Sequence, residues 1–255
     1  MKNQIIVNAD DFGWDKSCSE AILSAFESGY ISTSTMCVNG AYFEEAVSLV
    51  KNSPYRNQIG IHINLTEGRP LTDGIRKNPL FCDAGGNYIG FPHLYRRLSA
   101  KDKKDIRDEM IAQITKFKST GLNIHHVDSH HHIHNAINIF EIYLAVMKAQ
   151  GISKIRKFRN IGKIIFPKKI AKSFYNSRLK KNGFAYTDFF GDVCDYKTLN
   201  DFKYQDQIIE LMTHPDFDSD GVLIDRDPSS AYEKPFGPPL KDMIALISEK
   251  GDVLI

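Results

Sequence analysis

Short apolar runs alternate with longer amphipathic stretches along this 255-residue chain. Residues 4–8 contain an uninterrupted Ile-Ile-Val run, which is typical of a strand buried on both faces. Residues 58–66 alternate isoleucine or leucine with mostly polar residues, and this period of two indicates another strand. The pattern predicts strands over 4–8, 32–39, 58–66, 124–128, 153–158, 185–190, 208–213 and 252–255.

Helices are predicted between these strands, because apolar residues recur there at helical spacing. Polar residues mark the predicted starts. Asp15 is a predicted N-cap, and Ser99 followed by Asp102 resembles a helix-start signal. Asn135 can cap the helix predicted over about 136–150, which follows a histidine-rich stretch. The helices are expected at about 16–28, 41–51, 99–120, 136–150, 167–181 and 239–249.

Alternating strands and helices predict an α/β fold with a parallel sheet and helical crossovers. Seven or eight such units favour a closed, TIM-barrel-like (β/α) barrel over an open doubly wound sheet. Residues 67–98 show neither period and carry many Gly, Pro and Asn residues, so we expect a long loop or lid there. No repeat or linker interrupts the chain, which predicts one catalytic domain over 1–255.

Composition argues against several kinds of partner. A net charge of +2 is too small to favour nucleic acid or an anionic membrane. Basic residues gather between Lys154 and Lys181, which we interpret as a solvated face with a minor chance of an anion contact. The four cysteines form no CxxC pair, and no run approaches a membrane span or a secretion signal. We therefore expect a cytoplasmic protein with reduced thiols. The sequence does not settle the oligomeric state, and a homodimer is one of the states that it leaves open.

Candidate chemistry centres on residues 125–134, which hold six of the nine histidines and one aspartate. Imidazole is a common ligand for divalent transition metals, and carboxylate usually accompanies it. An engineered tag or a solvated polar loop are the alternatives. A tag would be terminal and homopolymeric, whereas this stretch is internal and contains apolar residues. The stretch therefore predicts a metal site that also needs ligands from elsewhere in the chain.

Four polar clusters fall where predicted strands end: Asp10-Asp11, His62, residues 128–130 and Thr213-His214. The carboxyl ends of barrel strands carry the chemistry of such folds. Asp10 and Asp11 would point to opposite sides of a strand unless the chain turns there, which Gly13 allows. A helix-capping pair is the alternative interpretation of the two aspartates. His62 considered alone would more often be a buried core histidine.

Several motifs occur in a fixed order along nearly the whole chain: NADDFG at 8–13, STST at 32–35, GIH at 60–62, LTEG at 65–68, HVDSHHHIH at 126–134 and HP at 214–215. These motifs resemble those of the YdjC-like carbohydrate deacetylases, which are related to chito-oligosaccharide deacetylases and share a distorted (β/α) barrel with NodB-type enzymes. The resemblance implies hydrolysis of the N-acetyl group of an amino sugar or short chito-oligosaccharide, with release of acetate.

The resemblance also implies a role for individual residues. It makes Asp11, His62 and His130 the ligands of one divalent metal ion, with Mg²⁺ or Zn²⁺ foremost and Co²⁺, Mn²⁺ or Ni²⁺ also suitable. Asp10 would be the general base and His214 the general acid. The alternative assignment exchanges the roles of Asp10 and Asp11. Asp128 and His132 fit a supporting pair. Two substrate contacts are predicted from position instead: Trp14 directly follows the predicted metal-binding turn, and Phe236 lies in a loop expected to touch the distal part of the substrate.

Two other classes of function are open at this point. A phosphoesterase-like metal hydrolase on the same barrel would bring more basic residues to the rim or a second set of metal ligands. A non-catalytic sugar-binding relative would lack Asp10 or His214, and both are present. The segment 234–240 departs from the family, which usually carries an arginine-containing segment there, so the size of the substrate is in question. Tyr88 in the long loop either stacks on a sugar or packs the lid.

Overall fold

The structure is a computed structural model that describes residues 2–90, 96–162, 164–184, 187–199, 206–226 and 237–254. Its strands are β1 (Asn3–Phe12), β2 (Thr33–Met36), β3 (Ile59–Ile63), β4 (Val127–Ser129), β5 (Phe189–Asp192), β6 (Ile208–Thr213), β7 (Pro215–Phe217), β8 (Leu223–Asp225) and β9 (Gly251–Val253). Its α-helices are α1 (Lys16–Glu27), α2 (Phe43–Val50), α3 (Asp73–Arg76), α4 (Ala100–Ser119), α5 (Ile137–Ala149), α6 (Phe166–Lys181) and α7 (Leu240–Ser248). The 3₁₀ helices are η1 (Pro54–Asn57), η3 (His130–Asn135) and η4 (Val193–Thr198).

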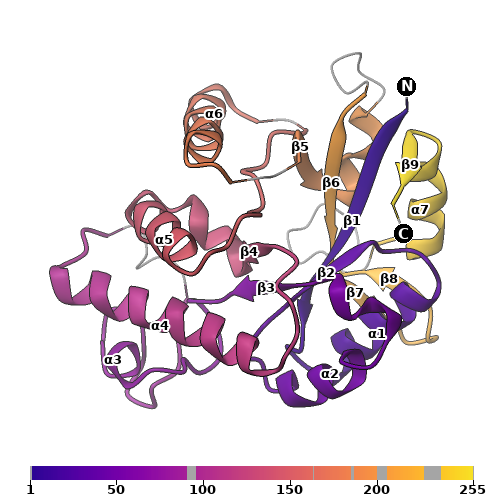
Figure 1. The fold of residues 1–255 in the computed structure, drawn as a ribbon. Coiled ribbons are helices and arrows are strands. Elements are labelled where there is room, and N and C mark those ends of the chain that lie inside the picture. The colour runs from indigo at the N-terminus through magenta and orange to yellow at the C-terminus, as the bar shows by residue number, and fades with distance from the viewer. Residues whose placement is uncertain are drawn as a thin grey trace.

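The principal sheet is parallel and curled, with the order β4-β3-β2-β1-β6-β5 (Figure 1). β9 joins the amino-terminal part of β1, and a small antiparallel hairpin, β7–β8, follows β6. The predicted α/β class and parallel sheet are confirmed. The sheet forms a half-barrel, and a closed barrel of seven or eight strands is not confirmed. Among the described residues, the edge strands β4 and β5 do not pair with each other.

An irregular segment, residues 153–161, spans the gap between β4 and β5. It forms a single bridge with β4, between Val127 and Ile155, where the Arg156 N–H donates to the Val127 carbonyl at 2.9 Å. On the other side, the Asn160 N–H donates to the Phe190 carbonyl of β5 at 3.0 Å. The strand predicted over 153–158 is therefore wrong. The segment bonds first to one edge and then to the other, so it cannot keep a regular ladder with either, and it carries Arg156 into the interior of the half-barrel.

Local sequence signals account for the helix starts. The Asp15 side chain accepts from the Cys18 N–H at 2.9 Å, and Ser99 forms a capping box with Asp102, so both predicted starts are confirmed. The predicted cap at Asn135 is wrong. Helix α5 begins after Ala136 without a side-chain cap, because Asn135 is still the last residue of η3.

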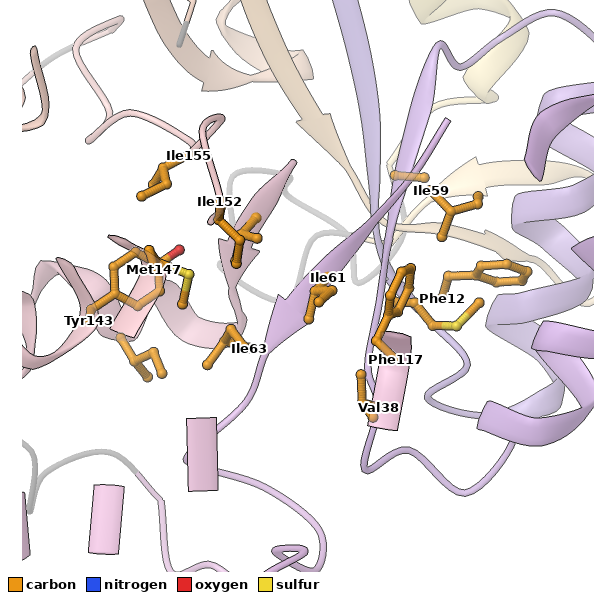
Figure 2. Packing of buried hydrophobic residues seen from close by; sticks show 14 of the residues in the cluster. Phe12, Val38, Ile59, Ile61, Ile63, Phe117, Tyr143, Met147, Ile152 and Ile155 are labelled. Carbon is orange, nitrogen blue, oxygen red and sulfur yellow. The ribbon is translucent and has the colours of Figure 1, made fainter. Parts of the chain in front are cut away.

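The core lies between the sheet and its helices. All five residues of β3 are buried, including those at the polar positions of the alternating pattern. Figure 2 shows Phe117 of α4, together with Tyr143 and Met147 of α5, gathered around the isoleucines of β3. One face of β3 therefore packs on helices, and His62 faces the inside of the curled sheet.

The long segment 67–98 is anchored to α4 where it is described. The Glu109 carboxylate accepts from the backbone N–H groups of Leu71 (2.9 Å) and Thr72 (2.8 Å). The segment also contains the one-turn helix α3, and Tyr88 is buried within the core cluster. Of the two interpretations of Tyr88, packing is therefore confirmed. In the described residues, no helix combines the length and apolarity that crossing a membrane needs.

Candidate active site

The four polar clusters predicted at strand ends meet in one pocket of about 500 Å³. They lie at the carboxyl ends of β1, β3, β4 and β6, which share one edge of the curled sheet. The candidate residues that line the pocket are Asp10, Asp11, Trp14, His62, His130, His132 and His214. Parallel pairing therefore brings together residues that lie up to 204 positions apart in the chain.

The Asp10-Asp11 pair sits at a turn within β1. The pairing with β2 shifts register between Ala9 and Phe12, and Asp11 has a φ of 71°. This left-handed conformation costs a non-glycine residue about 1–3 kcal/mol. It lets two successive carboxylates enter one site instead of pointing to opposite faces. The predicted turn is thus present, although it begins at Asp11 itself rather than at Gly13.

Asp11 lies between two imidazoles. Its Oδ1 atom is 3.2 Å from His62 Nε2 and 2.9 Å from His130 Nδ1. Burial would raise the pKa of the Asp11 carboxyl, but the two histidines hold that pKa well below its usual value. This arrangement places one oxygen and two nitrogen donors from three different strand ends around a common point.

A second carboxylate stands behind each of these histidines. Asp128 Oδ1 is 2.7 Å from His62 Nδ1, and Glu67 Oε2 is 3.3 Å from His130 Nε2. Burial would lower the pKa of both imidazoles. Asp128 and Asp11 outweigh it at His62, whose pKa is raised, while Asp11 and Glu67 raise the pKa of His130 to about 9. Carboxylates in this position orient metal-ligating histidines, so the donor set fits a divalent cation.

Asp10 faces a different partner, Arg156. The guanidinium makes two 2.7 Å bonds to the Asp10 carboxylate, and it also lies 2.7 Å from Asp128 Oδ2 and from Glu210 Oε1. Burial alone would raise the pKa of Asp10, but Arg156 holds it well below the usual range. The side chain of Arg156 is fully buried. Our interpretation of the basic stretch from Lys154 to Lys181 as a solvated face is therefore wrong for this residue.

His214 is placed by the turn after β6. Asp225 Oδ1 accepts from the His214 N–H and from the Thr213 hydroxyl, both at 2.7 Å. Burial would lower the pKa of the His214 imidazole, but the Asp10 and Asp11 carboxylates raise it. Its buried Nδ1 atom has no hydrogen-bond partner among the described residues.

The remaining histidines of the stretch differ from His130. His132 lines the pocket, but burial and the charge of Arg156 lower its pKa to about 3. His134 lies 2.5 Å from the Ser129 hydroxyl. His125 and His126 face each other through their Nδ1 atoms at 3.0 Å and line other cavities. His130 contacts the Asp11 carboxylate, whereas His131 lies 3.0 Å from the Thr66 hydroxyl.

The two predicted substrate contacts have different outcomes. Trp14 lines the pocket, but one face of its indole stacks on the His130 ring, with centroids 5.5 Å apart. Phe236 lies outside the described residues. Sequence reasoning missed Arg156 and Glu67. The one available signal was indirect: several carboxylates at neighbouring strand ends require a buried cation, and the segment predicted to lie beside them carries Arg156.

Comparisons with known proteins agree with this architecture. The sequence model of the family described as YdjC-like protein matches residues 4–250. The chain is 30% identical to a carbohydrate deacetylase of Clostridium beijerinckii over 99% of this chain and 98% of that one. It is 33% identical to a carbohydrate deacetylase of Geobacillus stearothermophilus, over 84% and 80% of the two chains. A solved structure of a putative cellobiose-phosphate cleavage protein from Enterococcus faecalis shares the fold, with a TM-score of 0.74, 19% identity and coverage of 100% and 97%.

Proposed function

This chain belongs to the YdjC-like protein family, and we propose that it is a metal-dependent carbohydrate deacetylase that removes N-acetyl groups from an amino sugar or short chito-oligosaccharide. The curated relatives support deacetylation of a carbohydrate. The observation that carries the metal dependence is the position of Asp11 Oδ1 within 3.2 Å of His62 Nε2 and 2.9 Å of His130 Nδ1. These three residues would hold one divalent cation at the floor of the pocket.

A divalent cation bound there would lower the pKa of a water molecule and polarise the acetyl carbonyl. The chain's own residues then handle the protons. Asp10 lines the pocket beside Asp11 and is the candidate general base. Within the described residues, its Oδ1 accepts from Asn8 and Arg156, whereas its Oδ2 accepts from Arg156 alone. A lone pair on Oδ2 is thus left to take the proton of the attacking water.

Arg156 keeps Asp10 ionised and oriented. A carboxylate with a low pKa is a weak base, but it is fully deprotonated at neutral pH and needs no rearrangement before it accepts a proton. The fixed guanidinium also prevents Asp10 from turning towards the histidines that flank Asp11. This separation supports assigning the base to Asp10 and the metal ligand to Asp11.

His214 is the candidate general acid. Its raised pKa favours the protonated form in the resting site, and such a group can donate to the amine nitrogen when the C–N bond breaks. The water contributes its oxygen to acetate, and the sugar amine leaves with the proton from His214. Each of these acid–base steps contributes about 10²–10⁴-fold to the rate.

A phosphoesterase is less well supported. Arg159 and Arg226 both line the pocket, as such an enzyme would require. However, Arg159 is bound to Asp195 at 2.7 Å and Arg226 to Asp216 at 2.9 Å. Each positive charge is therefore already neutralised by a carboxylate, which weakens the attraction of this rim for a phosphate.

The test is acetate release from N,N′-diacetylchitobiose by the metal-loaded protein, with and without a chelator. We expect acetate from the wild type, its loss on chelation and its return when metal is added. Asp11→Ala should lose several kcal/mol of transition-state stabilisation, or about 10³-fold in rate. His125→Ala is the control, because His125 lines a different cavity. Metal-loaded protein that releases no acetate from any acetylated mono- or oligosaccharide would contradict the proposal.

A further inference from the structure

A thiol, Cys37, lies against the same carboxylate oxygen as the two histidines. Cys37 directly follows β2, is fully buried, and donates its backbone N–H to the Phe12 carbonyl at 2.7 Å. Its Sγ atom is 3.5 Å from Asp11 Oδ1. Donor atoms of Asp11, Cys37, His62 and His130 all lie within 4.8 Å of one another. The cluster therefore contains four donors, one of which is sulfur.

We propose that Cys37 is a fourth protein ligand of this cation site and gives it a preference for zinc or cobalt over magnesium. The inference rests on the proposed metal dependence and adds to it the identity of the metal. Thiolate sulfur favours zinc and disfavours magnesium, which takes oxygen ligands in a regular octahedron. A site with one oxygen, two nitrogen and one sulfur donor matches the ligand chemistry of zinc.

The spacing of the donors supports this assignment. Ligands about 2.0 and 2.3 Å from one tetrahedral zinc, as oxygen and sulfur are, lie about 3.5 Å apart. The distance between Asp11 Oδ1 and Cys37 Sγ is 3.5 Å, and that between Asp11 Oδ1 and His62 Nε2 is 3.2 Å. The four side chains can thus surround a small cation with little movement.

Sulfur also approaches from a different side than the other donors. Asp11, His62 and His130 line the pocket, whereas Cys37 is not among the residues that line it. Sulfur would thus close the buried side of the site, and water or substrate would enter from the pocket side as a fifth ligand, a coordination number that catalytic zinc sites can reach. On binding, the S–H bond breaks, its electron pair is shared with the cation, and the proton leaves to water, so nothing is oxidised or reduced.

A second thiol nearby provides a stringent comparison. Cys18 also approaches Asp11, but its Sγ atom lies 3.5 Å from the Asp11 backbone carbonyl rather than from the carboxylate. Cys18 is not part of the four-donor cluster. Cys82 is also buried, but it lies in the 67–98 segment and does not line the pocket. Cys18 therefore tests whether proximity to Asp11 is enough to bind the cation, and Cys82 tests whether burial of the thiol is enough.

The test is a titration of metal-free protein with Co²⁺, followed by absorbance. We expect one Co²⁺ per chain and an intense near-ultraviolet band from sulfur-to-cobalt charge transfer. Cys37→Ser and Cys37→Ala should lose the band while still binding Co²⁺, and their preference for Zn²⁺ over Mg²⁺ should fall about tenfold or more. Cys18→Ser and Cys82→Ser should keep the band.

Co²⁺ bound without the band, or a band that survives in Cys37→Ser and disappears in Cys18→Ser, would overturn the assignment while leaving the metal dependence intact. A wild-type protein that binds no Co²⁺ would instead overturn both this inference and the proposed metal dependence. If the Cys37 variants do not fold, zinc X-ray absorption of the wild type decides. It should show a sulfur neighbour at about 2.3 Å, and only nitrogen and oxygen neighbours would contradict the inference.

Discussion

His130 and His132 stand two positions apart in the same histidine-rich stretch, and the structure places them in opposite electrostatic environments. His130 lies between the carboxylates of Asp11 and Glu67, and its pKa is raised to about 9. His132 is buried near Arg156, and its pKa is lowered to about 3. The surroundings of His130 favour a positive charge at that ring, whereas the surroundings of His132 favour its neutral form.

This difference teaches that the density of histidines marks the site but does not decide the role of each ring. The neighbouring carboxylates distinguish the rings, and they come from β1, β4 and the loop after β3. At His131 and His132 the backbone is left-handed, with φ values of 50° and 51°. The chain therefore turns sharply after His130, and the next ring, His131, lies 3.0 Å from the Thr66 hydroxyl and 3.6 Å from Glu67 Oε1.

Removal of Arg156 should have the largest effect on this comparison. In Arg156→Met, the carboxylates of Asp10, Asp128 and Glu210 remain buried without their common guanidinium, and stability should fall by about 3–5 kcal/mol. The pKa of His132 should rise, because Arg156 lowers it. Chemical denaturation and NMR titration measure the two effects.

Arg159→Met is the matched control for this prediction. Arg159 is partly exposed and bonds one carboxylate, Asp195, so its loss should cost about 1 kcal/mol or less. Equal losses of stability in the two variants would show that the buried Arg156 network contributes no more to the free energy of unfolding than the partly exposed Arg159–Asp195 pair.

A smaller effect is expected from Glu67→Gln, which removes one of the two carboxylates that contact His130. The amide keeps the size of the side chain but removes the negative charge 3.3 Å from His130 Nε2. Affinity for Zn²⁺ should fall about 10–100-fold, since carboxylates behind ligating histidines contribute that much. Calorimetric titration measures it, and unchanged affinity would remove Glu67 from the site.

The sequence predicts features that depend on neighbouring residues better than those that depend on contacts between distant parts of the chain. The Asp15 and Ser99 caps, the buried run of β1 and the alternation of β3 are local features, and they predicted their elements correctly. Hairpin β7–β8 was missed because each strand has three residues, too few to show a period. Arg156 and Glu67 were missed because their burial and partners depend on the tertiary fold, which a basic stretch or a loop motif does not reveal.

A separate effect is expected on the pH dependence of stability in metal-free protein. The folded chain holds the His130 proton more tightly than the unfolded chain, whose pKa is about 6.5. That stabilisation is complete below pH 6.5 and lost as the pH rises towards 9. For His132 the folded chain resists the proton that the unfolded chain takes up, so stability falls as the pH drops from 6.5 towards 3.

His130→Asn and His132→Asn should therefore change the pH profile in opposite windows. The first should remove a loss of stability above pH 6.5, and the second should remove one below it, each by up to about 1.4 kcal/mol per pH unit. Denaturant midpoints measured across the pH range check this. Profiles altered in the same window would contradict the electrostatic contrast.

The most direct measurement of the central claim, that Asp11, His62 and His130 hold the cation needed for deacetylation, is a Zn²⁺ titration of His130→Ala and His132→Ala beside the wild type. The account predicts one ion per chain in the wild type, at least about a 100-fold loss of affinity in His130→Ala, and an affinity close to that of the wild type in His132→Ala. Equal losses in the two variants, or a loss confined to His132→Ala, would contradict it.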